Sequence, residues 1–335
     1  MLDYNINNTI LLEKIAGKTF LVTGGVGFIG SHIVECLVMN DAKNVTILDN
    51  LSTSFFANIS DLKNYNNFNF IEGNICDYDL VYKVSKDVDY VIHLAALGSV
   101  PRSINDPLLT NKVNIEGHLN ILNASRINNV KRVVYAASSS TYGDSTILPK
   151  KEENIGKPLS PYAVTKYVNE LYSDVFYKCY GLETIGLRYF NVFGPRQNPN
   201  GQYAAVIPLF FNAIIKNEDV FINGEGNQTR DFTYVDNVVI ANLKALFVEN
   251  LDAVNQVYNV ACGERTSLNL LFKFISEITN NKNIKPIYRE NRIGDVKDSL
   301  ADLSKIKNLL NYNPIVFLKE GLLKSFKFYH NRSNE

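Results

Sequence analysis

A glycine-rich segment near the beginning of the chain constrains the fold more than any other feature. It runs from Thr23 to Gly30, with glycine at positions 24, 27 and 30, and it joins an apolar run at Thr19–Thr23 to a stretch over residues 28–39 that is compatible with a helix. This spacing permits a tight turn, a close approach of backbone to a pyrophosphate, and close packing of helix on strand. The amino end of the helix offers free N–H groups and a positive dipole end to phosphate oxygens. The segment therefore predicts a strand–loop–helix unit that binds a dinucleotide.

Asp49 identifies the dinucleotide. It ends a second apolar run, Val45–Leu48, at about the 20-residue distance expected of the acid that hydrogen-bonds the adenosine ribose. A carboxylate at this place repels a 2′-phosphate, and the following residues, Asn50 to Ser54, contain no lysine or arginine to hold one. The sequence therefore predicts NAD rather than NADP as the cofactor.

Apolar runs alternate with helical stretches through the first half of the chain. Continuous apolar runs are typical of strands that are covered on both faces. Their alternation with helices predicts an α/β domain built on a doubly wound parallel sheet. Besides the two runs above, the expected strands are 68–72, 90–95, 132–138 and 183–190, and a short helix is expected over about Asn7 to Ala16.

The character of the sequence changes after about Asn191, where turn-forming glycine, proline and asparagine become frequent. We expect residues 1–190 to form the NAD-binding Rossmann domain. Residues 235–262, read as a helix followed by a strand, are expected to rejoin it. Residues 191–234 and 263–335 are expected to form a smaller α/β domain that binds the substrate.

Composition excludes several classes of partner. Lys+Arg and Asp+Glu each count 34, so the formal net charge is zero and gives no reason to expect nucleic-acid or membrane binding. The four cysteines form no C-x-x-C pair, so neither a metal site nor a disulfide is expected. A basic-then-apolar leader and apolar runs of membrane-spanning length are not found, and the expected compartment is the cytoplasm.

Tyr162 and Lys166 are four residues apart in a stretch that begins with Pro161 and is compatible with a helix. Residues with this spacing share one helical face. An unperturbed tyrosine has a pKa of about 10 and is a poor base at neutral pH. A neighbouring lysine cation and a bound nicotinamide cation both favour the phenolate, and we expect them to lower the tyrosine pKa.

The glycine spacing, G-x-x-G-x-x-G, followed by Asp49 and the Tyr162/Lys166 pair, resembles the extended short-chain dehydrogenase family from about Lys18 to Tyr312. Aligning Tyr142-Gly143 with the family's Tyr-Gly pair implies that Ser138 is the third catalytic residue, beside Tyr162 and Lys166. In this resemblance Ser138 hydrogen-bonds the sugar 4-hydroxyl, and Ser139 and Ser140 contact the substrate.

The resemblance also implies a set of cofactor-binding residues. Asn74 stands where the family often has an aspartate that contacts adenine, and Asn114 is expected to brace the strand beside the cofactor. The full set is Gly24, Gly27, Phe28, Ile29, Gly30, Asp49, Asn50, Ser52, Asn74, Ile75, Leu94, Ala95, Ala96, Asn114, Tyr162, Lys166, Tyr189 and Val192.

A nucleotide-sugar pocket is implied in the same way. Arg230 and Arg292 lie in segments that resemble those bringing two arginines to a UDP diphosphate, for which planar guanidinium groups are suited. Asp295 would hold the ribose, and Ser299 matches a position where a bulky tyrosine excludes an N-acetyl group. The full set is Ser99, Ser139, Ser140, Tyr162, Asn191, Ala205, Val206, Phe221, Asn223, Arg230, Arg292, Asp295 and Ser299.

Ser139 and Ser140 also bear on the reaction. Sugar 4,6-dehydratases of the family carry Asp-Glu at these positions and decarboxylases usually carry a glutamate nearby, so serines favour reversible oxidation at carbon 4, that is, epimerisation. The segment from Ala95 to Pro107 is similar to bacterial polysaccharide enzymes that interconvert UDP-N-acetylglucosamine and UDP-N-acetylgalactosamine, or their uronic acids. Small residues at Gly98, Ala205 and Ser299 agree with an acetamido sugar.

Several alternatives stay open at this point. They are a UDP-glucose 4-epimerase, a dehydratase or decarboxylase of the same family, a reductase that releases its cofactor, and a non-catalytic NAD-sensing module. The resemblance implies a homodimer formed by helices near Asn111 to Ser125 and Tyr162 to Tyr177.

Overall fold

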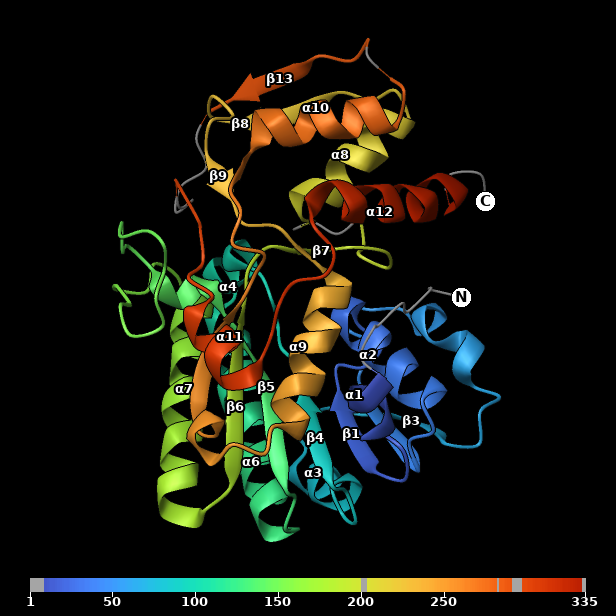
Figure 1. The fold of residues 1–335 in the computed structure, drawn as a ribbon, viewed down its shortest axis with the longest axis vertical. Coiled ribbons are helices and arrows are strands. Elements are labelled where there is room, and N and C mark those ends of the chain that lie inside the picture. The colour runs from blue at the N-terminus through green and yellow to red at the C-terminus, as the bar shows by residue number, and fades with distance from the viewer. Residues whose placement is uncertain (1–8, 200–203, 282, 291–296, 333–335) are drawn as a thin grey trace.

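The computed structural model describes residues 9–199, 204–281, 283–290 and 297–332. Its centre is a sheet of seven strands, all parallel, in the order β11-β6-β5-β4-β1-β2-β3 (Figure 1). The predicted doubly wound parallel sheet is thus confirmed. The strands are β1 (Thr19–Thr23), β2 (Asn44–Asp49), β3 (Phe68–Glu72), β4 (Tyr90–His93), β5 (Arg132–Ser138), β6 (Glu183–Tyr189) and β11 (Gln256–Val260).

Helices cover both faces of this sheet because successive side chains of each strand point to opposite faces. In β1, Phe20 and Val22 pack into one buried cluster, and Leu21 between them packs into another. The first cluster lies under α2 (Phe28–Met39), α9 (Val235–Phe247) and α11 (Ser304–Leu310). The second lies under α3 (Tyr78–Val84), α6 (Gly117–Ile127) and α7 (Pro161–Tyr180).

A second group of elements lies beyond the carboxyl ends of the strands, at the top of Figure 1. Its core includes the buried aromatic residues Phe193, Phe211 and Tyr234, and β8 pairs in parallel with β13. Its members are α8 (Val206–Ile215), β8 (Val220–Asn223), α10 (Leu268–Ile278), β13 (Pro286–Arg289) and α12 (Leu318–Arg332).

Short elements connect these two parts. The two-stranded pairs are β7 (Val192–Phe193) with β10 (Thr233–Tyr234), and β9 (Thr229–Arg230) with β12 (Thr266–Ser267). The remaining helices are α1 (Thr9–Glu13), α4 (Val100–Asn105), α5 (Pro107–Asn111) and the short turns η1 (Phe56–Asn58), η2 (Ser60–Leu62), η3 (Lys112–Glu116), η4 (Ser139–Tyr142) and η5 (Leu251–Ala253). The expected first helix is thus found as α1, while Asn7 and Asn8 lie outside the described residues. Within the described part of the chain, no helix has the length and apolar character of a membrane span.

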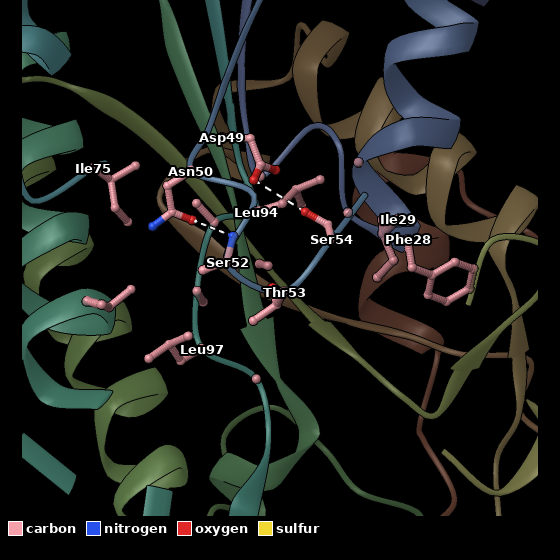
Figure 2. Close-up of a pocket in the computed structure, with 18 of the residues that line it drawn as sticks. Phe28, Ile29, Asp49, Asn50, Ser52, Thr53, Ser54, Ile75, Leu94 and Leu97 are labelled. Carbon is pink, nitrogen blue, oxygen red and sulfur yellow. Dashed lines mark hydrogen bonds between the residues drawn. The ribbon is translucent and has the colours of Figure 1, made fainter. Parts of the chain in front are cut away.

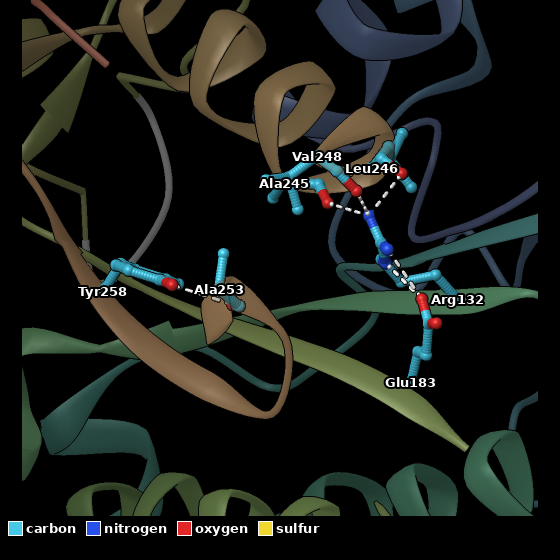
Figure 3. A network of polar contacts seen from close by, with 7 residues as sticks. All are labelled: Arg132, Glu183, Ala245, Leu246, Val248, Ala253 and Tyr258. Atoms are coloured by element: carbon cyan, nitrogen blue, oxygen red, sulfur yellow. Dashed lines mark hydrogen bonds and ion pairs between the residues drawn. The ribbon is translucent and has the colours of Figure 1, made fainter. Parts of the chain in front are cut away.

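The chain leaves the sheet after β6 and returns to it through α9 and β11, which pairs with β6. Arg132, the first residue of β5, binds the end of α9 and the start of β6 (Figure 3). It lies at the opposite end of the sheet from the glycine loop. Its Nη1 donates to the carbonyl oxygens of Ala245, Leu246 and Val248 at 3.0, 2.8 and 2.8 Å. Its Nε and Nη2 donate to Glu183 at 2.9 and 2.6 Å. Because the last carbonyls of a helix have no partner within the helix, this arginine satisfies the carboxyl end of α9.

Candidate active site

The glycine loop joins β1 to α2 and packs directly against the segment that follows β4. Gly24 has a φ of +69°, and a Cβ built on it would lie 2.7 Å from the backbone nitrogen of Ala95. A Cβ on Gly30 would lie 2.2 Å from the carbonyl oxygen of Gly24. Both positions therefore require glycine for steric reasons. Gly27, which has no side chain, is the N-cap of α2, so the amino end of this helix faces the loop.

A cavity of about 490 Å³ lies at this loop and continues along the carboxyl ends of the neighbouring strands (Figure 2). Its size and its mixture of apolar walls and a few polar groups are typical of a cofactor site. All the predicted cofactor residues line it except Asn114. They are Gly24, Gly27, Phe28, Ile29, Gly30, Asp49, Asn50, Ser52, Asn74, Ile75, Leu94, Ala95, Ala96, Tyr162, Lys166, Tyr189 and Val192, and Ser138 lines it too.

Asp49 ends β2 at the edge of this cavity and is almost fully buried. Its Oδ2 accepts the N–H of Val26 at 3.1 Å, and its Oδ1 accepts the N–H of Leu51 at 2.9 Å and the hydroxyl of Ser54 at 3.3 Å. The carboxylate therefore fixes both loops that border this end of the cavity. Lys166, at the other end, is the one cationic side chain among the described residues in the wall. A negative charge at the ribose end, without a cation beside it, fits NAD and repels a 2′-phosphate.

Asn74 and Asn114 differ in their places. Asn74 lines the cavity, but its side-chain oxygen accepts the N–H of Cys76 at 2.9 Å, so its contact with adenine stays a prediction. Asn114 is fully buried behind the wall, in the π-helical turn η3. Its amide accepts from the N–H of Leu97 at 2.8 Å and donates to the carbonyl of Leu97 and to Thr165 at 3.2 and 3.1 Å. It therefore ties the segment after β4 to α7, behind the cavity.

Ser138, Tyr162 and Lys166 meet at the end of the cavity opposite Asp49. Ser138 is the last residue of β5, and its Oγ accepts from the backbone N–H and the hydroxyl of Ser140 at 3.1 and 2.9 Å. The other two lie in the first turns of α7, which begins at Pro161 and is capped by the Ser160 side chain. The Nζ of Lys166 donates to the carbonyl oxygen of Ala136 at 2.8 Å and lies 6.0 Å from the Tyr162 ring centroid.

Burial dominates the electrostatics of this trio. It raises the pKa of Tyr162, and a hydrogen bond with Ser138 opposes that rise. It lowers the pKa of Lys166 to about 8, against the favourable charge of Glu170. Burial thus sets the direction of the Tyr162 shift, and the expected lowering of its pKa by Lys166 together with a nicotinamide cation stays a prediction.

Among the described residues predicted to bind the sugar nucleotide, those other than Tyr162 lie outside this cavity wall. Asn191 donates to the carbonyl oxygen of Asp231 at 3.1 Å, and Arg230 donates to the carbonyl oxygens of Thr229 and Lys297 at 3.0 and 3.2 Å. Arg292 and Asp295 fall outside the described residues. The others are Ser99 at the start of α4, Ser139 and Ser140 in η4, Ala205 and Val206 at the start of α8, Phe221 and Asn223 on β8, and Ser299.

Phe221 is exposed, and the guanidinium carbon of Arg289 lies 3.2 Å from its ring centroid. Gly98 lines the cavity, and a Cβ built on it would meet open space. Other wall residues were not singled out from the sequence, among them Thr53, Leu97 and Gln197. Gln197 has a buried Oε1 with no hydrogen-bond partner within the described structure. Its place just after Gly194-Pro195, beyond the end of β7, is the sequence signal that could have identified it.

The fold and this arrangement of glycine loop, acid, serine, tyrosine and lysine define an extended short-chain dehydrogenase. The model of the NAD dependent epimerase/dehydratase family matches residues 20–261, so the chain belongs to that family and NAD is its cofactor. A putative UDP-glucose 4-epimerase of Methanocaldococcus jannaschii is 40% identical over 319 residues, which are 93% of this chain and 99% of that protein. The chain is therefore an enzyme of the UDP-sugar 4-epimerase family.

Solved structures agree with this assignment. The UDP-N-acetylglucosamine 4-epimerase from Methanobrevibacter ruminantium, in complex with UDP-N-acetylmuramic acid, is 42% identical with a TM-score of 0.90. The match covers 95% of this chain and 99% of that one. The UDP-glucose 4-epimerase of Thermotoga maritima with UDP-glucose is 38% identical with a TM-score of 0.88, over 94% and 99% of the two chains. The predicted family and cofactor are thus confirmed.

Proposed function

We propose that the enzyme interconverts UDP-N-acetylglucosamine and UDP-N-acetylgalactosamine, or the corresponding uronic acids, by epimerisation at carbon 4. The observation that carries the reaction type is the turn η4, which directly follows Ser138. It contains Ser139 and Ser140 and no carboxylate. A dehydratase or decarboxylase needs a further acid or base beside the sugar, so the composition of this turn favours epimerisation.

Ser138, Tyr162 and Lys166 each have a separate role in the proposed reaction. NAD, held by the glycine loop and Asp49, would supply the hydride acceptor and donor for the oxidation and reduction at carbon 4 of the sugar. Tyr162 Oη receives the proton of the sugar 4-hydroxyl and gives it back after the 4-keto sugar has turned over. Ser138 holds the 4-oxygen through both steps, and it already interacts with the Tyr162 hydroxyl. The Lys166 cation, fixed by Ala136, favours the phenolate form once the nicotinamide adds its own positive charge.

The choice of acetamido sugars rests on small residues. Gly98 faces open space, and Ser299 provides a short side chain where related enzymes that exclude the acetamido group have a tyrosine. The name of the Methanobrevibacter relative, UDP-N-acetylglucosamine 4-epimerase, agrees with this choice, whereas the Methanocaldococcus and Thermotoga relatives carry the name UDP-glucose 4-epimerase. We assign UDP binding to residues 191–234 and 263–335, with Asn191, Arg230, Arg292 and Asp295 as its polar contacts.

A homodimer forms part of the proposal. Exposed apolar side chains lie on α7 at Leu171, Tyr172 and Val175 and on neighbouring α5 at Leu108 and Leu109. Leu108 is 83% exposed. Exposed apolar side chains on neighbouring helices are typical of an interface between protein chains. In the proposed dimer, a second copy of the same helices covers these side chains. The proposed compartment is the cytoplasm.

The test is a panel of UDP-sugars incubated with the purified enzyme, with the epimers separated by chromatography and NADH followed by absorbance. The proposal expects equilibrium between the two UDP-N-acetylhexosamines, or between their uronic acids, with no net NADH. Turnover of UDP-glucose alone would establish the plain hexose epimerase instead. Release of water or CO₂, or net consumption of NADH, would assign the enzyme to the dehydratases, decarboxylases or reductases.

A further inference from the structure

Residues 297–302, called the strap below, run between the two parts of the molecule. The first residues of the strap lie alongside β9, which lies in the segment 191–234 that is assigned to the smaller domain. The N–H of Thr229 donates to the carbonyl of Lys297, and the N–H of Ser299 donates to the carbonyl of Thr229, both at 3.1 Å. The Thr229 hydroxyl also donates to Asp298 Oδ1 at 2.6 Å. The beginning of the strap is therefore part of the small domain.

The other end of the strap is bound to the sheet domain. The N–H of Lys150 donates to the carbonyl of Leu300 at 2.7 Å, and the N–H of Asp302 donates to the carbonyl of Lys150 at 2.9 Å. Between them, the N–H of Ala301 donates to the buried carboxylate of Asp231 at 3.2 Å. Ser299 thus lies in a short extended segment that is held on both edges.

Asn259, in β11, connects this end of the strap to η4 (Ser139–Tyr142), which is called the serine turn below. It is completely buried, and its Nδ2 donates to the carbonyl oxygens of Lys150 and Asp302 at 2.8 and 3.1 Å. Its Oδ1 accepts the hydroxyl of Tyr142 at 2.6 Å. One amide therefore connects the backbone at Lys150, the backbone at Asp302 and the side chain of Tyr142.

Tyr142 is the last residue of η4, the turn that begins directly after Ser138. Its ring lies 4.9 Å from the guanidinium of Arg188, which donates to both carboxylate oxygens of Glu170 at 2.8 and 2.7 Å. Glu170 lies one helical turn beyond Lys166 on α7. The contacts of Asn259 therefore link the strap to the serine turn η4, which follows Ser138, and to helix α7.

We infer that Asn259 is a positioning residue that fixes Ser299 relative to the serine turn and so sets the width of the sugar pocket. The inference rests on the proposed function for the identity of the sugar and for the place of Ser299 in the sugar pocket. A fixed wall contributes to binding equally in the ground state and the transition state, so its loss raises KM and leaves kcat largely unchanged.

The experiment compares Asn259→Asp with Asn237→Asp in the NAD-loaded enzyme. The aspartate keeps the acceptor for Tyr142 but replaces both Nδ2 donors with an oxygen that repels the two carbonyls. Asn237 is the matched control, because it is equally buried and its Nδ2 donates to the carbonyl of Val316 and to the Sγ of Cys262, neither of which belongs to the strap. KM, kcat and bound NAD are measured for each, with hydrogen exchange of the strap amides.

Asn259→Asp is expected to raise KM for the UDP-sugar about tenfold, the effect of leaving a buried carbonyl unpaired. Its kcat and NAD content stay near those of the wild type, and its strap amides exchange faster. Asn237→Asp is expected to change none of these. Equal KM changes in both variants, or a loss in kcat alone, would overturn the inference.

Tyr142→Phe covers the case in which Asn259→Asp does not fold. It removes one hydroxyl and is expected to raise KM less than tenfold and to speed exchange at the strap. Unaltered KM and exchange in this variant would also overturn the inference. The exchange readout separates the two proposals, since a wild-type enzyme without epimerase activity refutes the function while the strap amides still report on Asn259.

Discussion

The ammonium group of Lys166 lies 6.0 Å from the centroid of the Tyr162 ring and donates its hydrogen bond to the carbonyl oxygen of Ala136. The lysine is therefore held in place independently of the tyrosine. Burial of the pair raises the tyrosine pKa and lowers the lysine pKa. We therefore expect proton transfer at this site to depend on a positive charge supplied by the cofactor.

Tyr162→Phe should reduce kcat by ~10²–10⁴-fold, the range for a positioned acid–base group. Its affinity for the UDP-sugar should change little, because the ring remains in the wall. Lys166→Met should act in the same direction through loss of the buried cation. Steady-state kinetics with calorimetric titration of the UDP-sugar checks both variants. Near-normal turnover in Tyr162→Phe would make the proposed proton transfer untenable.

The parts of the site that lie close together in the sequence were the predictable ones. The glycine spacing and the i, i+4 placement of Tyr162 and Lys166 follow from local geometry, and all of these residues line one cavity. Asn259 and Asp231 gave no such signal, because they act on backbone groups tens of residues away. The direction of the Tyr162 pKa shift depends on burial, which the sequence pattern did not disclose.

Asp49→Asn should weaken retention of NAD and reduce the preference for NAD over NADP. The amide keeps the size of the side chain but loses the negative charge that repels a 2′-phosphate. We expect the wild-type enzyme to carry bound NAD(H) from purification, released on denaturation and measured by chromatography. Asp61→Asn, at an exposed position outside the cavity, is the control. Wild-type protein that retains NADP in preference would contradict the role of Asp49.

Ser299→Tyr should discriminate against acetamido sugars. Forcing a ring into an occupied pocket costs ~1–3 kcal/mol, which is roughly a ten- to hundredfold loss in kcat/KM. UDP-glucose and UDP-galactose carry only a hydroxyl at carbon 2 and should lose much less. The ratio of kcat/KM for the two substrate classes is the readout, with Ser299→Ala as the control. An unchanged ratio would show that Ser299 does not line the sugar pocket.

Leu171→Glu should convert the proposed dimer into monomers, because it places a charge in the apolar surface of α5 and α7. Leu323→Glu is the matched control: Leu323 is 51% exposed against 50% for Leu171, and it lies on α12. Light scattering at micromolar concentration measures the mass of each. A wild-type protein that is monomeric under these conditions would count against the dimer.

Asp236→Asn should alter the pH dependence of stability. Burial raises the pKa of Asp236 to about 6, with Lys324 opposing the rise, and its Oδ1 has no hydrogen-bond partner in the described structure. The folded protein thus holds this proton more tightly than the unfolded chain does, so the contribution of Asp236 to wild-type stability is lost as the pH rises from about 4 to about 6.

The Asp236→Asn variant has no titrating group at this position, so its stability lacks this contribution to the pH dependence. The difference in unfolding free energy, variant minus wild type, should therefore increase by about 2 kcal/mol between pH 4 and pH 7. Denaturant titrations at several pH values measure it. A difference that stays constant, or that decreases over this range, would show that Asp236 is ionised well below pH 6 in the folded protein.

The return of α9 and β11 to the large sheet has a consequence for engineering. A chain cut after β6 would lack the strand that pairs with that edge and the helix whose last carbonyls Arg132 satisfies. An exposed, unpaired strand edge favours aggregation. Chimeras that exchange substrate specificity between relatives therefore require two grafted segments, one on each side of α9 and β11, with Thr229 and the strap taken from the same parent.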